Sequence, residues 1–349
     1  MTESKPIPSA WRSRVWLILR PLWMVFLITS GAYGVSLTAY IILRGLTGER
    51  FNSVALIANF LHVMVLAAVV LFVIVLIARR WLLVTELLLP AATGIVYLWG
   101  VFVPTTLPIT PIAMPTLNVL SYNIYAHTGD YSATQAVIEQ AAADIVLIQE
   151  YNFSAEAALI PPLETLYPYR ALDAQPIGTQ GQGVLSIYPI LESAYFQNGL
   201  PVQLGHQRLV IDFNGQPIVI YNVHPAHPLM SGGQVANRSQ DIERLLARAE
   251  ADAAQYPVML IGDFNLTDQT ADYAALSARY TDAFASVGYG LGYTFPNLPD
   301  FGIWQFVPPL ARIDYQFGDA RWQAISARVW PTAGGSDHYP LLVKWGLMG

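Results

Sequence analysis

Three long apolar runs dominate the first part of the chain and cover about residues 22–43, 54–78 and 81–103. A helix needs about 20 apolar residues to cross a bilayer core that is about 30 Å thick, and each run reaches that length. The alternative, a buried helix of a soluble core, does not suit the stretch 63–78, which has no polar residue and no amphipathic period. The pattern therefore predicts three transmembrane α-helices within residues 1–103.

The pattern then changes to short apolar strands separated by helical stretches. Strands are predicted at residues 116–122, 145–149, 183–187, 208–213, 217–223, 257–261, 312–317, 324–330 and 341–344. Helices are predicted at residues 132–143, 233–254 and 270–279. Asn214-Gly215 lies between two predicted strands and indicates a two-residue hairpin. Mixed strands and helices favour one α+β domain at 116–349, joined to the membrane helices by a proline-rich linker at 104–115.

The composition fits a membrane region followed by a polar domain. Hydrophobic residues make up 54% and charged residues 12% of the chain, whereas roughly a quarter of a soluble domain is charged. The first 103 residues carry eight basic and three acidic residues, and the remainder carries ten basic and twenty-one acidic residues. The chain has no cysteine, which excludes disulfides, thiolate metal sites and cysteine nucleophiles.

The positions of the basic residues predict an orientation. Four of them, from Lys5 to Arg20, precede the first apolar run, and Arg79-Arg80 fills the turn between the second and third runs. The positive-inside rule places these segments in the cytoplasm. We therefore expect a multi-pass cell-membrane protein with a cytoplasmic N-terminus and an extracytoplasmic second part.

Polar side chains recur where predicted apolar strands end or begin. The six places are Asn123, Glu150, His224, the pair Asp263 and Asn265, Asp314, and the pair Asp337 and His338. Asp and Asn commonly cap turns, so each place alone has an ordinary structural explanation. Six such places within one domain are hard to explain in that way, and we interpret them as one active site.

The residue types also suit one kind of chemistry. Oxygen ligands without cysteine favour a hard cation such as Mg²⁺, Mn²⁺ or Ca²⁺. Such a cation neutralises a phosphoryl oxygen, Asp and His supply acid–base groups, and Asn donates hydrogen bonds to developing charge. No glycine-rich phosphate loop, serine nucleophile elbow or zinc-helix motif competes with this interpretation.

The same motifs, in this order, resemble those of the endonuclease/exonuclease/phosphatase family. The matching segments are Ser-Tyr-Asn123, Gln-Glu150, Asn-Val-His224, Gly-Asp263-Phe-Asn265, Arg-Ile-Asp314-Tyr and Ser-Asp337-His338. The family includes deoxyribonuclease I, abasic-site endonucleases, neutral sphingomyelinases and inositol-polyphosphate 5-phosphatases. The resemblance spans about residues 116–344 and implies a four-layer α/β/β/α sandwich after the three transmembrane helices.

The resemblance also implies a metal site and a water-activating residue. Glu150 is expected to be the main metal ligand, helped by Asn123 and Asp337. Asp263 is expected to orient or deprotonate the attacking water, and Asn265 to hold the phosphate.

The histidines receive roles in the same way. His338, fixed by Asp314, is expected to contact the phosphate and take part in acid–base work, and His224 is expected to face the phosphate or the leaving group. Three further candidates for substrate contact are Asn222, His227 and Arg208. Of these, the histidine is equally explained as a loop residue near the site, and the arginine as a strand residue paired with acids.

The substrate is not selected by the family, because its members act on many phosphate esters. The second part of the chain has a net charge of −11 and a single lysine, Lys344, and nucleic-acid binding usually needs a basic face. The tether to a bilayer and the aromatic, Gly/Pro-rich segment 288–310 favour a lipid-linked phosphate ester, although these rings are also explained by packing inside the sandwich. The layout further resembles bacterial membrane members associated with teicoplanin resistance and proposed to act on polyprenyl pyrophosphates.

Three hypotheses remain for the function. The first is a membrane-surface phosphodiesterase or phosphatase for phospholipid or lipid-pyrophosphate headgroups, with the lipid bilayer as its partner. The second is an extracytoplasmic nuclease that degrades DNA or RNA. The third is a non-catalytic binding protein that retains the fold, and the intact set of site residues argues against it. Protein partners are not identified by the sequence.

Overall fold

The fold is known from a computed structural model, which describes residues 9–103, 114–176, 178–228, 233–298, 302 and 306–348, with side chains from residue 19 onward. The chain forms two compact units that alternate along the sequence. Met1–Gly48 and Leu61–Leu98 make up the first unit, and Glu49–Phe60 and Trp99–Gly349 make up the second. Most of the predicted linker lies outside the described residues, as do parts of the aromatic segment 288–310.

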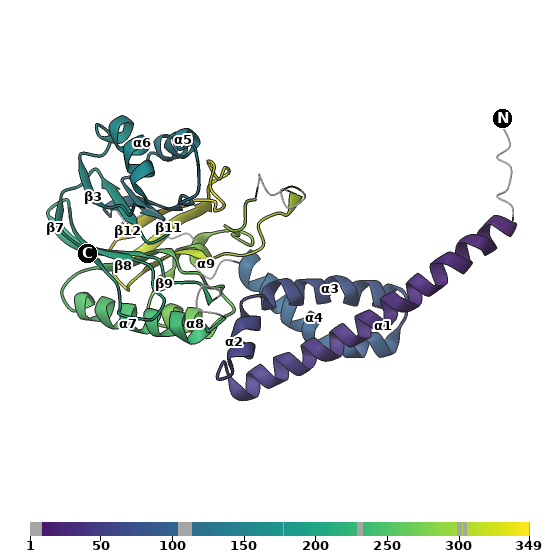
Figure 1. The fold of residues 1–349 in the computed structure, drawn as a ribbon. Helices are drawn as coiled ribbons and strands as arrows, with labels where there is room; N and C mark the ends of the chain where they lie inside the picture. Colours follow the sequence, from purple (N-terminus) through teal and green to yellow (C-terminus); the bar gives the residue numbers. More distant parts are fainter. Residues whose placement is uncertain are drawn as a thin grey trace. The chain divides into compact units, whose positions relative to one another are not determined.

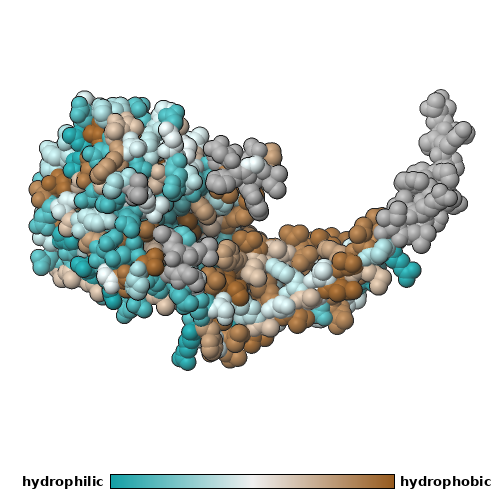
Figure 2. Space-filling model, in the orientation of Figure 1, coloured by the Kyte–Doolittle hydropathy of each residue, from teal (hydrophilic) through white to brown (hydrophobic). Residues whose placement is uncertain are grey.

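The first unit is built from apolar helices, and the reader can follow them in Figure 1. These are α1 (Ser9–Thr47), α3 (Leu61–Ile77) and α4 (Trp81–Phe102), whose last residues belong to the second unit. Gly94 allows close packing of α4 on α3, because a Cβ there would lie 2.6 Å from the carbonyl oxygen of Val65. Most outward-facing side chains of these helices are apolar, as the brown surface in Figure 2 shows.

Among the described residues, two helices are long and apolar enough to cross a membrane: α1 from Leu19 to Thr47, and α4. A third span exists only if α3 is joined with α2 (Asn52–Ala58), and the axes of these two helices differ by 64°. The structure therefore differs from the continuous helix predicted over residues 54–78. The chain turns at Asn59 and Phe60, and α2 belongs to the second unit.

The second unit holds two six-stranded sheets. The strands of the first sheet are β1 (Thr116–Asn123), β2 (Ile145–Gln149), β3 (Tyr169–Asp173), β4 (Gln182–Ser186), β11 (Trp322–Val329) and β12 (Leu341–Leu347). The strands of the second are β5 (Ile190–Phe196), β6 (His206–Phe213), β7 (Gln216–Val223), β8 (Val258–Asp263), β9 (Thr281–Asp282) and β10 (Asp314–Gly318). Their orders are β11-β12-β1-β2-β4-β3 and β5-β6-β7-β8-β10-β9.

Helices cover the outer face of each sheet, so that four layers result (Figure 1). α5 (Ser132–Ala141) and α6 (Phe153–Leu163) pack on the first sheet, and α7 (Val235–Ala253) and α8 (Ala271–Ser277) pack on the second. The inner faces of the sheets share a core of aliphatic and aromatic side chains, including the fully buried Trp345. This confirms the predicted α/β/β/α sandwich.

The topology gathers strand ends from both sheets at one edge. β1 runs parallel to β2, and the carboxyl ends of this pair carry Asn123 and Glu150. β7 runs parallel to β8, and the carboxyl ends of that pair carry His224 and Asp263. β10 is antiparallel to β8, so that its first residue, Asp314, pairs with Asp263. β12 is antiparallel to β1, which brings the segment before β12 to the same edge.

Five elements of the second unit lie outside the predicted ones: β3, β5, β9, α6 and α9 (Ala283–Val287). β5 is exposed along most of its length and shows no apolar alternation. α6 contains Pro161-Pro162 near its end, and proline disfavours a helix interior. The hairpin at Asn214-Gly215 is confirmed, because these residues have φ values of 57° and 88° and join β6 to β7.

Candidate catalytic site

Asp263 lies at the centre of the strand-end residues and is 1% exposed. Its Oδ2 accepts a hydrogen bond from Asn123 Nδ2 at 3.1 Å. The same oxygen lies 3.5 Å from His224 Nε2 and 3.8 Å from His338 Nε2. Burial alone would raise the pKa of Asp263, but the two histidines outweigh burial and lower it below its usual value. Asp263 is therefore a buried carboxylate at neutral pH.

The turn after β8 depends on two unusual backbone conformations. Gly262 has φ 147°, and a Cβ there would collide with the carbonyl oxygen of Val223 on β7. Asn265 has φ 51°, a conformation that Asn tolerates better than most residues. The Asn265 amide donates to Asp263 Oδ1 at 2.9 Å, and its Nδ2 donates to the carbonyl of Pro225 at 3.0 Å. The Gly-Asp-Phe-Asn segment thus holds the carboxylate and the amide side chain next to each other.

His338 and Asp314 form a buried pair beside this carboxylate. His338 Nδ1 lies 2.9 Å from Asp314 Oδ2, and the two residues are 4% and 1% exposed. Burial lowers the pKa of His338, but Asp314 and Asp263 outweigh burial and raise it to about 10. His338 is therefore protonated at neutral pH and can donate a hydrogen bond or a proton to a phosphoryl oxygen.

Replacing Asp314 with asparagine is expected to move the alkaline limb of the kcat–pH profile to lower pH. In the wild-type protein His338 keeps its proton up to about pH 10. Without the Asp314 carboxylate, the largest influence that raises the pKa of His338 is lost while burial still lowers it and Asp263 still raises it, so the pKa falls toward its ordinary value of about 6.5. The measurement is kcat between about pH 6 and pH 10 for both proteins. An alkaline limb at the same pH in both would contradict the role of this pair.

The backbone of His224 is hydrogen-bonded to a second buried histidine–aspartate pair. Its backbone N–H donates to His206 Nδ1 at 3.1 Å, and His206 Nε2 lies 3.3 Å from Asp241 Oδ2. Burial lowers the pKa of His224, but Asp263 reverses the effect and the pKa is raised. His224 is thus fixed through its own backbone and presents Nε2 to the central carboxylate.

Two further carboxylates, Glu150 and Asp337, belong to the same site. Glu150 has φ 61°, and its Oε2 accepts a hydrogen bond from the amide of Ala126 at 2.8 Å. Asn123 Nδ2 lies 3.3 Å from Glu150 Oε1. Asp337 Oδ1 is buried and has no hydrogen-bond partner among the described residues. Burial raises the pKa of Asp337 to about 6, with His338 opposing the shift and Glu150 adding to it.

Two sets of side chains could hold a divalent cation. Asp263, Asp314 and His338 offer ligand atoms within 4.8 Å of one another. His338 is protonated in this pairing, however, and a metal-ligating histidine must be neutral. The second set combines two carboxylates with an amide: Glu150, Asp337 and Asn123. Oxygen donors of this kind suit a hard cation, which would also give the buried Asp337 Oδ1 the partner that it lacks.

Cation affinity is expected to fall as pH drops through about 6. Asp337 has a pKa raised to about 6, and a carboxylate must lose its proton to bind a metal. One competing proton weakens binding by about tenfold per pH unit below that pKa. Titration calorimetry with Mg²⁺ on the full chain between about pH 5 and pH 7.5 measures the effect. Asp337→Asn should lose this pH dependence, and a wild-type affinity that is flat across the range would contradict the assignment.

Of the three predicted substrate contacts, the structure brings His227 to the site and leaves the other two elsewhere. His227 is half-buried; burial lowers its pKa, and Asp263 raises it. Asn222 is fully buried between the sheets, where it accepts a hydrogen bond from Gln149 Nε2 at 2.7 Å. Arg208 binds both carboxylate oxygens of Asp252 on α7. The Asn222 contact joins the two sheets, and the Arg208 contact joins the second sheet to α7. These structural roles explain why an asparagine and an arginine stand at those positions.

Residues that the sequence did not single out surround His338. Ser336 Oγ donates to the carbonyl of Asn123 at 2.7 Å and accepts from the amide of His338 at 3.0 Å. The ring of Phe295 lies 4.8 Å from the ring of His338, centroid to centroid. Asn297 Nδ2 donates to the carbonyl of Ser336 at 2.7 Å. Their only signal in the sequence is closeness to the motifs, because side-chain support across loops has no local pattern.

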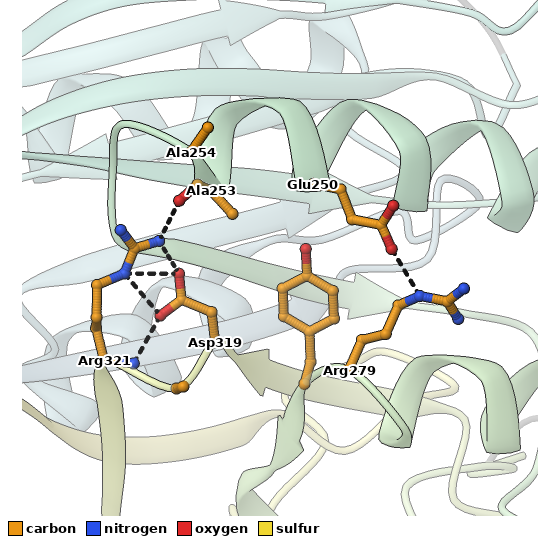
Figure 3. Close-up of a pocket in the computed structure, with 8 residues that line it drawn as sticks. Glu250, Ala253, Ala254, Arg279, Asp319 and Arg321 are labelled. Atoms are coloured by element: carbon orange, nitrogen blue, oxygen red, sulfur yellow. Dashed lines mark hydrogen bonds and ion pairs between the residues drawn. The ribbon is translucent and has the colours of Figure 1, made fainter.

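A surface hollow of about 510 Å³ lies near the other end of β8 (Figure 3). Its arginines are already paired: Arg279 Nε lies 2.6 Å from Glu250 Oε1, and Arg321 binds Asp319. Asp319 Oδ2 also accepts a hydrogen bond from the amide of Val258, the first residue of β8. The hollow is therefore separate from the strand-end site, and its paired charges leave it without an assigned role.

A sequence profile that matches the region with these residues identifies the family. The sequence profile described as "Endonuclease/Exonuclease/phosphatase family" matches residues 120–338, which is more than half of the chain and includes every strand-end residue above. The chain belongs to the endonuclease/exonuclease/phosphatase family. As a family member it is a metal-dependent hydrolase of phosphate esters. No curated protein matches the sequence.

Solved structures of endonuclease/exonuclease/phosphatase proteins share the fold. One is the protein of this family from Beutenbergia cavernae, with 20% identity, a TM-score of 0.53, and coverage of 67% of this chain and 72% of that one. Another is TDP2 from D. rerio complexed with single strand DNA product, with 17% identity, a TM-score of 0.55, and coverage of 66% and 99%. A third is a mannosyl-6-phosphatase from Bacteroides thetaiotaomicron, with 18% identity, a TM-score of 0.52, and coverage of 66% and 99%. At these identities the likeness concerns the fold alone.

Proposed function

We propose that the protein is a membrane-anchored, Mg²⁺-dependent phosphoesterase that hydrolyses lipid-linked phosphate esters, either phospholipid headgroups or polyprenyl pyrophosphates. Membership of the family indicates hydrolysis of a phosphate ester, and the apolar helices support a location at a membrane. The finer assignment of substrate rests on how the catalytic histidine is connected to the end of an apolar helix.

The observation that carries the proposal is the short segment from Tyr289 to Phe295. One end of this segment contacts the last turn of α4, and the other end contacts His338. The ring of Tyr289 packs edge-on against Phe102 at 5.3 Å between centroids, and neighbouring backbone groups share a hydrogen bond. Tyr289 is 75% exposed, as expected for an aromatic ring at a lipid interface. Six residues further on, the ring of Phe295 contacts the ring of His338 at 4.8 Å between centroids. A six-residue segment spans at most about 20 Å, so a headgroup near the helix end is within reach of the site.

The metal site is proposed to consist of oxygen donors from the first sheet and the loop before β12. Glu150, Asn123 and Asp337 would hold Mg²⁺, because their carboxylate and amide oxygens match its preference. When bound, the cation would neutralise charge on a phosphoryl oxygen.

The chain's own acid–base groups complete the proposed reaction. Asp263, ionised and buried, orients the attacking water and accepts its proton. His338, kept protonated by Asp314, donates to the phosphoryl oxygen. His224 faces the same carboxylate and would serve the leaving group, and Asn265 would hold the phosphate through its amide.

The distribution of basic residues supports lipid over nucleic acid. A nucleic-acid surface needs unpaired Lys or Arg to neutralise successive phosphates. The second part of the chain has one lysine. Its buried or half-buried arginines are paired with acids: Arg208 with Asp252, Arg238 with Asp272, and Arg312 with Asp282.

The full chain in phospholipid nanodiscs with Mg²⁺ tests the proposal. Three substrates are compared at equal concentration: sphingomyelin, a polyprenyl pyrophosphate and supercoiled plasmid DNA. We expect kcat/KM for one lipid substrate to exceed that for DNA by about 100-fold or more, which corresponds to about 2.7 kcal/mol of discrimination. Activity should vanish with EDTA and return with Mg²⁺.

The outcomes separate the three hypotheses. Faster nicking of DNA than turnover of either lipid would overturn the lipid assignment in favour of a nuclease. No hydrolysis of any substrate by the wild-type protein, with Mg²⁺ bound, would favour a non-catalytic protein. Asp263→Asn serves as the control for contaminating hydrolases, because it should lose the activity whichever ester is cleaved.

A further inference from the structure

The carbonyl group of Asn265 is held by a buried arginine. Arg238 on α7 is 0% exposed, and its Nη1 donates to the Asn265 carbonyl at 2.6 Å. Asn265 lies in the left-handed backbone region, so the orientation of its peptide groups determines where its side chain points. The arginine therefore acts on the site through the backbone of Asn265.

Arg238 needs several acceptors, because burying a guanidinium without them is costly. Its Nε donates to Asp272 Oδ2 at 3.2 Å, which supplies the compensating charge. Its Nη1 has a second acceptor, Asn59 Oδ1, at 2.9 Å. Asn59 lies two residues before the start of α3 and is far in sequence from the strand-end motifs.

Asn59 is part of a segment, Glu49–Phe60, that belongs to the second unit, which also holds the strand-end residues. Val54, Ala55 and Ala58 of this segment are buried. Asn52 Oδ1 accepts a hydrogen bond from the amide of Val235, the first residue of α7, at 2.8 Å.

Further contacts of the segment surround the catalytic turn. The carbonyl of Asn59 accepts from Thr267 Oγ1 at 3.1 Å, two residues beyond Asn265. Glu49 Oε1 accepts from the amide of Ala271, the first residue of α8, at 3.0 Å.

We infer that the second unit needs the segment Glu49–Phe60 for turnover, and that Asn59 and Arg238 are positioning residues that together fix the orientation of Asn265. The inference rests on the phosphoesterase site and is independent of which ester is cleaved. The simpler alternative is that the segment only adds packing. The two explanations differ because only the first requires the polar group of Asn59 for turnover.

The test compares variants of the full chain in detergent, with Mg²⁺ and bis(4-nitrophenyl) phosphate as the probe. Asn59→Ala removes the acceptor and is expected to lower kcat by about tenfold with little change in KM, since a small misplacement of a catalytic group is enough to slow the reaction. Asn59→Asp keeps an oxygen in place and is expected to stay within about threefold of the wild-type kcat.

Asn237→Ala is the matched control. Asn237 is also half-buried and lies beside Arg238 on α7, but its side chain bonds both backbone groups of Val202, away from Asn265. This variant should lose as much thermal stability as Asn59→Ala while it keeps the wild-type kcat. Equal loss of kcat in both variants, or no loss in Asn59→Ala, would overturn the inference.

Two further measurements make the test independent of the substrate. In a double-mutant cycle, Asn59→Ala should add little to the loss caused by Arg238→Lys, whereas Asn237→Ala should be additive with it. Amide hydrogen exchange of residues 263–267 should be faster in Asn59→Ala than in the wild type or in Asn237→Ala, even without substrate. If the probe is not hydrolysed at all, the exchange rates alone decide the inference, and the three-substrate comparison alone decides the proposed function.

Discussion

Replacing Asp263 with asparagine lowers kcat by about 10³-fold or more while the protein remains folded. The exchange preserves the shape of the side chain and its place at the end of β8, but it removes a carboxylate that lies 3.5 Å from His224 Nε2 and 3.8 Å from His338 Nε2. An amide cannot accept a proton from water, and it no longer offsets the charge on the histidines. The measurements are kcat and KM with any accepted phosphate ester, together with a thermal denaturation curve.

Asp319→Asn is the matched control for that substitution. Asp319 is also buried and accepts a hydrogen bond at the other end of β8, from the amide of Val258. The control should change stability without a comparable change in kcat. If Asp263→Asn retained more than a tenth of the wild-type kcat, the assignment of this carboxylate to the chemistry would be wrong.

Replacing His338 with glutamine is expected to have the second-largest effect, a loss of about 10²–10⁴-fold in kcat. Glutamine can still donate a hydrogen bond, but it cannot carry the proton that Asp314 and Asp263 hold on the imidazole. The remaining activity should no longer show the alkaline limb that belongs to the histidine. The measurement is the kcat–pH profile of the purified variant, compared with the wild type.

Tyr339→Phe supplies the comparison for His338→Gln. Tyr339 is the next residue, and its hydroxyl donates to Asn297 Oδ1 at 3.3 Å. Its loss should leave kcat within about threefold of the wild type. If the tyrosine variant lost as much activity as the histidine variant, support of the loop, and not proton transfer, would explain both.

The strand-end residues could be predicted because they follow a local rule. Apolar runs such as 145–149 and 257–261 indicate buried strands, and polar residues directly after such runs are conspicuous. Their convergence in space follows from the parallel pairs β1–β2 and β7–β8. The local pattern therefore predicted the strand ends, and the family resemblance implied the four layers; the roles of the individual residues stay predictions.

Support from distant segments could not be predicted, because it leaves no periodic pattern. Asn222 looked like part of a motif, yet its amide is used to join the two sheets. The run 54–78 looked like one continuous helix by hydropathy. The bend at Asn59 exists beside contacts with Arg238 and Thr267, which are about 180 to 210 positions away in sequence. No short stretch of the sequence contains both residues of either contact.

The sequence separation within the catalytic unit has a consequence for its synthesis. Asn52 and Gly233, which share a hydrogen bond, are separated by 181 positions. A ribosome adds about 5–20 residues per second, so the segment Glu49–Phe60 waits about 10 to 40 s for its binding surface to be made. During that interval the two following helices must be synthesised while the earlier segment stays available. The catalytic unit can therefore reach its final form only after α7 and α8 have emerged, when a segment made near the start of translation closes against them.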